Sequence, residues 1–225
     1  MNDTGPIILW FRRDLRLGDH PALTAAATSG RPVIPVVIHD EVVDGLGAAP
    51  KFRLGLSIKA LADSLSSKGS RLILRRGRAL DILRELVRDT GAGAVWWSRL
   101  YDPDARERDA AVKAALKDDG IYARSFAGHL LFEPWTVETQ QGAFYKVYTP
   151  YWKAVRGRDL PAARSAPNHI AGPDAWPTSD HIEDWQMGAA MNRGADVVAR
   201  HVTVGETAAS HRLSAFIAHR VADYK

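Results

Sequence analysis

The sequence predicts an α/β fold: a doubly wound, Rossmann-like parallel sheet of five strands. Two observations lead to this prediction. Short apolar runs rich in β-branched residues recur as far as residue 126, and segments with helical spacing lie between them. Runs that are apolar at every position are typical of strands covered on both faces, and strands that alternate with helices pair in parallel.

Five strands and four helices follow from these patterns. The apolar runs place the strands at residues 7–11, 33–38, 72–74, 94–97 and 121–126. Apolar positions three and four residues apart place the helices at residues 21–29, 52–68, 79–89 and 104–117. Asp19 is the expected N-cap of the first helix, and Gly69 is the expected stop after the second.

Two adjacent tryptophans, Trp96 and Trp97, end the fourth predicted strand. Adjacent strand residues point to opposite faces of a sheet, so one of the two is expected in the core. The other either lines a cleft or is also core. Core packing is the favoured role for both rings.

The pattern changes after residue 126, where long periodicity stops. We divide the chain into an α/β domain at residues 1–128, a linker at 129–204 and the start of a second domain at 205–225. The linker holds four tryptophans, which we expect to pack against the α/β domain because a free segment with so many large apolar rings would be poorly soluble. These are Trp135, Trp152, Trp176 and Trp185.

A last amphipathic helix is predicted at residues 207–223. Its apolar positions follow helical spacing, but no other element nearby offers it a surface to pack against. We therefore expect it to be the first helix of an all-α domain that this chain does not include. Exposed apolar surface on it would favour association.

Composition narrows the possible functions. The chain of 225 residues has a formal net charge of +4, which is compatible with a polyanionic partner and equally with an ordinary surface. It has no cysteine, which excludes disulfides, thiolate metal sites and cysteine nucleophiles and fits a cytoplasmic location. Neither a signal peptide nor a bilayer-length apolar run is expected. The eight histidines show no metal-ligand spacing, and there is no P-loop or GxGxxG motif.

Four stretches carry a more specific signal. They are LWFRRDLRLGDHPAL at residues 9–23, LLFEPW at 130–135, YKVYTPYWK at 145–153 and GETAASHRLSAF at 205–216. In sequence, order and spacing they resemble the photolyase/cryptochrome family. The resemblance covers the chain from end to end.

The resemblance implies a division of labour. In the family, an α/β domain often holds an antenna chromophore, and an all-helical domain binds the FAD that splits cyclobutane pyrimidine dimers flipped out of DNA. The chain is thus expected to be the light-harvesting half of a photolyase that is monomeric when complete. Tyr224 alone matches a family position that contacts FAD, so this chain by itself is expected neither to hold FAD nor to repair damaged DNA.

Antenna-binding candidates lie at the carboxyl edge of the predicted sheet, where open α/β sheets place ligands. Arg12, Arg13, Asp14 and Arg16 follow the first strand, and the alternative role for them is a salt-bridged loop. Of these, Arg12 and Asp14 are the candidates for the chromophore. Lys51 matches a position where deazaflavin-binding relatives often carry arginine, and its alternative role is a solvated lysine.

Asp104 and Ala105 bear on which chromophore is bound. The resemblance aligns them with an asparagine and a glutamate that contact the pterin ring in folate-binding relatives. The alanine side chain cannot accept a hydrogen bond, so methenyltetrahydrofolate is disfavoured. A deazaflavin is favoured over it, with Asp104 as a candidate contact, and another chromophore or none remains open. The alternative is that Asp104 caps the fourth helix, with Arg106, Glu107 and Arg108 on its exposed face.

Two other functions remain open from the sequence. The first is the corresponding half of a cryptochrome, a signalling receptor, which only repair activity of the whole protein would separate from a photolyase. The second is a standalone α/β nucleotide-binding module related by fold alone. That alternative leaves the tryptophan-rich linker and the unpartnered last helix unexplained.

Overall fold

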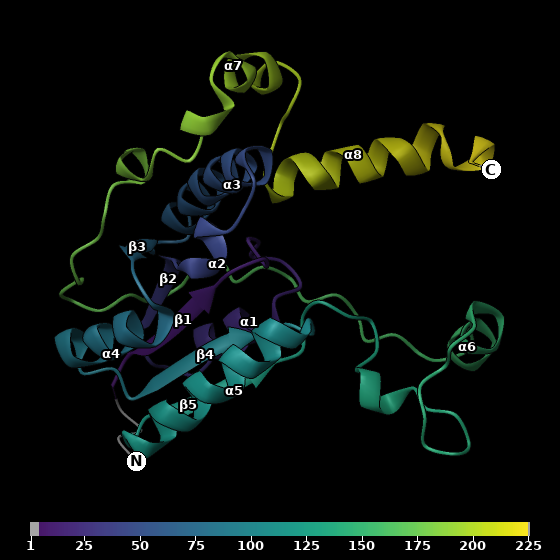
Figure 1. Ribbon diagram of the computed structural model, residues 1–225, viewed down its shortest axis with the longest axis horizontal. Helices are drawn as coiled ribbons and strands as arrows, with labels where there is room; N and C mark the ends of the chain where they lie inside the picture. Colours follow the sequence, from purple (N-terminus) through teal and green to yellow (C-terminus); the bar gives the residue numbers. More distant parts are fainter. Residues whose placement is uncertain (1–4, 225) are drawn as a thin grey trace.

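The computed structural model describes residues 5–224 and contains one all-parallel sheet of five strands in the order β3-β2-β1-β4-β5 (Figure 1). The strands are β1 (Ile7–Phe11), β2 (Val33–His39), β3 (Ile73–Arg76), β4 (Ala94–Ser98) and β5 (Tyr122–Phe126). The predicted fold class is confirmed. Because all five strands are parallel, their carboxyl ends lie at one edge of the sheet, and the strand order reverses between β1 and β4.

Helices cover both faces of the sheet. Residues of α1 (Pro21–Ala27) and α3 (Ala48–Ser66) pack in one apolar cluster with Leu9 and Trp96. Residues of α4 (Ala79–Thr90) and α5 (Pro103–Asp118) pack in a second with Trp10 and Trp97. The two adjacent tryptophans therefore point to opposite faces, and both are core residues, as predicted.

The edge strand β5 departs from the expectation that every strand is covered on both faces. Only Phe126 of its five residues is buried, and Tyr122 and Arg124 are exposed. β5 pairs with β4 alone, so its outer side faces solvent. Polar residues at alternate positions are typical of such an edge.

The N-caps of two helices and the start of a third differ from the predictions. The N-cap of α1 is His20, not Asp19, and the N-cap of α5 is Asp102, not Asp104. Both helices begin with a proline, whose missing N–H costs nothing at the first helical position. Helix α3, predicted at residues 52–68, begins at Ala48. Its first turn also tolerates a proline, Pro50.

The linker divides into two parts. Residues 164–187 run back along the α/β domain, where Ile170 N–H donates to Lys68 O at 3.0 Å and Val33 N–H donates to Ala171 O at 2.7 Å. Trp185 is buried, and Trp176 packs against one apolar cluster, as expected.

The other part of the linker is not packed in the way that we predicted. Trp135 is 58% exposed and Trp152 is 48% exposed. Trp152 lies on α6 (Tyr148–Val155), which stands apart from the sheet (Figure 1). The remaining short elements of the linker are η1 (Pro134–Thr136), η2 (Ile182–Trp185), η3 (Ala189–Met191) and α7 (Arg193–Ala199).

The predicted last helix is present as α8 (Glu206–His219), followed by the 3-10 turn η4 (Val221–Asp223). It extends away from the sheet (Figure 1), and none of its residues is buried. Leu213 and Ile217 are 59% and 58% exposed. No helix within residues 5–224 has the length and apolar character needed to cross a bilayer.

Candidate functional site

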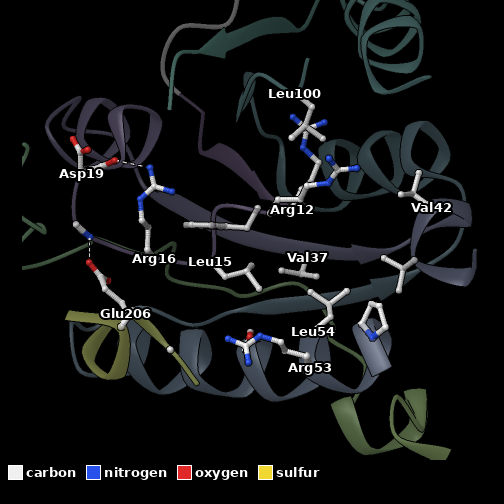
Figure 2. Close-up of a pocket in the computed structure, with 18 of the residues that line it drawn as sticks. Arg12, Leu15, Arg16, Asp19, Val37, Val42, Arg53, Leu54, Leu100 and Glu206 are labelled. Carbon is white, nitrogen blue, oxygen red and sulfur yellow. Dashed lines mark hydrogen bonds between the residues drawn. The ribbon is translucent and has the colours of Figure 1, made fainter. Parts of the chain in front are cut away.

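A cavity of about 900 Å³ opens at the carboxyl edge of the sheet. It is lined by the loop after β1, the end of β2, the short helix α2 (Glu41–Asp44), one face of α3 and the start of α8. This is the edge at which open α/β sheets bind ligands. In Figure 2, Leu15 and Val37 lie between Arg12 above and the α3 side chains of Arg53 and Leu54 below.

The cavity has apolar walls, and the side formed by Arg12 and Arg108, here called the floor, is charged. The walls include Leu15, Val37, Val42, Leu54 and Leu100. Apolar walls with a few placed polar groups are typical of sites for flat organic ligands.

A network of charged residues lies beneath the cavity. Arg12 Nη1 donates to Asp109 Oδ1 and Oδ2 at 2.7 and 2.8 Å, and Arg108 Nη2 donates to Asp109 Oδ1 at 3.2 Å. Arg108 Nη1 also donates to Asp40 Oδ2 at 3.0 Å. Both guanidinium groups stack over the buried Trp10 ring, at 4.5 and 5.1 Å from its centroid. The charge of Arg12 is therefore already paired with a carboxylate. We predicted Arg108 on the exposed face of its helix, but the structure places it in this network.

Asp40 sits where this network meets β2. Burial raises the pKa of its carboxyl above the usual value, against the opposing effects of Arg108 and of the Val42 and Val43 N–H groups. The same two N–H groups make Asp40 the N-cap of α2. The carboxylate thus fixes both the cavity floor and the adjacent helix.

Arg53 is a cation that lines the cavity and is available to a ligand. Within residues 5–224, no hydrogen bond or ion pair to another residue holds its guanidinium, and it lines the cavity together with Pro50, Leu54 and Ser57. These positions share one face of α3, because residues three and four apart on a helix are neighbours. Lys51 is not a lining residue, and its Nζ donates to Asp44 O at 3.1 Å. Lys51 was the predicted contact on this helix, and the spacing of the lining positions is the signal that separates Arg53 from it.

Asp14 and His20 form a buried pair behind the loop rather than in the cavity. Asp14 is 2% exposed and His20 is 1% exposed, and His20 Nε2 lies 2.9 Å from Asp14 Oδ2. His20 Nδ1 accepts a hydrogen bond from Leu23 N–H at 3.1 Å, which caps α1. The other imidazole nitrogen therefore carries the proton that faces the carboxylate.

The other predicted residues are held in the loop or lie at the surface. Arg16 Nη2 donates to the Asp19 and Gly128 carbonyl oxygens at 2.9 and 2.7 Å, and Arg13 pairs with Asp102 at 3.1 Å. Both line the cavity. Asp104 is exposed on the first turn of α5 and does not line it.

Tyr224, the position that the resemblance links to FAD, is 77% exposed and packs edge-on against Phe216, with ring centroids 5.7 Å apart. It does not line the cavity at the sheet edge. Tyr224 is a single exposed ring beyond the end of α8, and by itself it is not a site for a dinucleotide.

The sequence profile of the DNA photolyase family matches residues 7–168. The chain belongs to the DNA photolyase family. It is 43% identical over 215 residues to a deoxyribodipyrimidine photo-lyase of Agrobacterium fabrum, an alignment that covers 95% of this chain and 45% of that protein. It is also 32% identical to cryptochrome-2 of Arabidopsis thaliana, over 96% of this chain and 37% of that protein. This photolyase-family chain spans less than half the length of these relatives.

Solved structures agree with this assignment. A bacterial class III photolyase from Agrobacterium tumefaciens superposes with a TM-score of 0.79 at 45% identity, over 82% of this chain and 38% of that chain. An archaeal photolyase from Sulfolobus tokodaii, described as containing two FAD molecules, shares the fold with a TM-score of 0.66 at 21% identity. The resemblance found in the sequence is thereby confirmed.

Proposed function

We propose that this chain is the light-harvesting antenna domain of a deoxyribodipyrimidine photolyase and that the cavity at the sheet edge holds its antenna chromophore. One observation carries the proposal: at the carboxyl edge of the sheet, a cavity with apolar walls is also lined by Arg53, whose guanidinium has no hydrogen bond or ion pair to another residue within residues 5–224. A flat chromophore with an acidic group matches both features. When bound, such a chromophore absorbs near-ultraviolet or blue light and passes on the excitation.

The residues of the chain bind and orient the chromophore. The apolar walls exclude water from its ring, and Arg53 neutralises its acidic group. The network of Arg12, Asp109, Arg108 and Asp40 keeps the floor rigid, because each charge in it is already paired. Rigid walls limit the orientations that the ring can adopt.

A deazaflavin is the proposed chromophore, in preference to methenyltetrahydrofolate. The two positions aligned with the pterin contacts of folate-binding relatives are Asp104 and Ala105, and neither lines this cavity. Ala105 is buried, and its N–H donates to Asp102 Oδ1 at 3.2 Å as part of the α5 cap. A folate would therefore have to use other contacts.

For the whole protein we propose light-driven repair of cyclobutane pyrimidine dimers in DNA, with FAD held outside the part described here. Greater identity to a photolyase, 43%, than to a cryptochrome, 32%, favours repair over signalling. A thymine-dimer oligonucleotide assay under blue light tests this. The chain alone, supplied with FAD, is expected to repair nothing, and the whole protein is expected to restore the undamaged oligonucleotide. Failure of the whole protein to do so would favour the cryptochrome alternative.

Replacing Arg53 with alanine is expected to weaken binding of an acidic deazaflavin about tenfold, because one charge-assisted hydrogen bond is lost. Fluorescence titration of the purified chain measures the dissociation constant. Lys51→Ala is the matched control, since it removes a cation two residues away that does not line the cavity. Equal losses from the two substitutions would show that Arg53 acts only through general charge.

A further inference from the structure

The start of α8 is fixed to the α/β domain by one carboxylate. Glu206 Oε2 accepts a hydrogen bond from Leu17 N–H at 2.7 Å, and Glu206 Oε1 accepts one from Gly18 N–H at 2.8 Å. Figure 2 shows Glu206 on α8 reaching the loop that follows β1. Two successive backbone N–H groups directed at one anion form a nest, a recurrent way of binding a carboxylate.

A glycine lies on each side of the contact between Glu206 and the loop: Gly18 in the loop and Gly205 at the start of α8. A Cβ atom on Gly18 would lie 2.5 Å from Glu206 Oε1. Gly205, the N-cap of α8, has φ +97°, and a Cβ atom there would lie 3.0 Å from Ala60 Cβ on α3. Gly18 thus leaves room for the carboxylate, and Gly205 allows α8 to begin close to α3.

The contact matters to the cavity because α8 forms one of its walls. Ala209, Ser210 and Leu213 line the cavity, and all three are on the first two turns after Glu206. No residue of α8 is buried, so apolar packing holds this wall only weakly. The carboxylate of Glu206 is the strongest polar contact between α8 and the loop.

We propose that Glu206 is a positioning residue for the cavity: by seating its carboxylate on the Leu17 and Gly18 N–H groups, it holds α8 against the chromophore. Docking of α8 and occupancy of the cavity are then coupled, and each strengthens the other. This inference rests on the proposed function for the identity of the ligand. The seating of α8 itself does not depend on that identity.

The absence of cysteine makes α8 easy to follow. Ala218→Cys, at an exposed position that does not line the cavity, accepts a nitroxide label whose mobility is measured by electron paramagnetic resonance. Glu206→Ala and Glu206→Gln are compared in this background. The glutamine keeps the shape and one acceptor oxygen but turns its NH2 group toward the other backbone N–H, so a role as a double acceptor predicts a loss smaller than that of alanine. Asp196→Ala, in the first turn of α7, removes an exposed carboxylate without such a contact and is the control.

Two results are expected. Both Glu206 substitutions increase label mobility and weaken deazaflavin binding about 5- to 50-fold, and deazaflavin reduces label mobility in the chain that retains Glu206. The Asp196 control changes neither quantity. Thermal unfolding confirms that each variant remains folded, so a loss of affinity is not a loss of the fold.

Other results would overturn the inference. If Glu206→Gln leaves label mobility unchanged, the carboxylate does not seat α8. If mobility rises while deazaflavin affinity stays the same, the coupling is wrong although the proposed antenna function stands. If the chain with Glu206 intact binds no deazaflavin, the proposed function and the coupling both fail, and label mobility alone decides whether Glu206 seats α8.

Discussion

Replacing Asp14 with alanine is expected to lower the free energy of unfolding by about 3–5 kcal/mol. The carboxylate is buried, accepts the Arg12 N–H at 3.0 Å and faces His20 Nε2 at 2.9 Å. The substitution leaves these donors without an acceptor and loosens the histidine that caps α1. Urea unfolding followed by circular dichroism measures the change, and Asp104→Ala, which removes an exposed aspartate, is the control.

The effect of Asp14 is expected to depend on pH. Burial by itself would raise the pKa of Asp14, but the hydrogen bond and charge of His20, the Ser98 hydroxyl and the Arg12 N–H outweigh burial and hold it well below its usual range. The folded chain thus binds this proton less readily than the unfolded chain does. The stabilisation is complete above about pH 5 and is lost as the pH falls through the ordinary aspartate pKa near 4 toward the lower folded value. The difference in unfolding free energy between the chain with Asp14 and Asp14→Ala should therefore decrease as the pH falls from 7 to 3. A constant difference over this range would contradict the role assigned to the carboxylate.

Replacing Asp109 with alanine is expected to destabilise the chain by about 3–5 kcal/mol, because it leaves a buried cation unpaired. The Arg12 side chain is only 9% exposed, and Asp109 is its bidentate partner as well as a partner of Arg108. The same change should weaken deazaflavin binding, since both guanidinium groups form the floor of the cavity. Denaturant unfolding and fluorescence titration measure the two effects.

Asp119→Ala provides the matched comparison for Asp109. Asp119 pairs with Arg84 at 2.7 Å, but both side chains are about 40% exposed, so solvent screens the interaction. We expect its loss to change stability little and deazaflavin binding not at all. Similar destabilisation by the two substitutions would mean that burial does not set the importance of the Asp109 network.

The sheet could be predicted from the sequence because the central strands are apolar at every position. The edge strand was less clear, since Tyr122 and Arg124 are exposed on it and it has one neighbouring strand. The two N-caps could not be found from residue preference alone. Asp19 is a good capping residue by type, but it adopts φ +45° and its backbone N–H donates to Arg164 O at 2.7 Å, so His20 takes the cap.

The candidate site was predicted in its position but only partly in its residues. The loop after β1 does line the cavity, as expected of the carboxyl edge. Lys51 and Arg53 are two residues apart, a rotation of about 200° around α3, and of the two only Arg53 lines the cavity. Glu206 could not be found, because its partners Leu17 and Gly18 are distant in the sequence and contribute only backbone N–H groups. We expected all four linker tryptophans to be packed because exposed rings lower solubility, and the exposure of Trp135 and Trp152 contradicts this expectation.

The measurement that tests the antenna proposal most directly is an absorbance titration of the purified chain with a deazaflavin, in parallel with Ser57→Trp. Ser57 lines the cavity on the same face of α3 as Arg53, so an indole ring at this position fills the space that the chromophore needs. We predict saturable uptake of one chromophore by the chain with Ser57 and none by the folded Ser57→Trp variant. No uptake by either chain, or equal uptake by both, would contradict the assignment of this cavity as the antenna site.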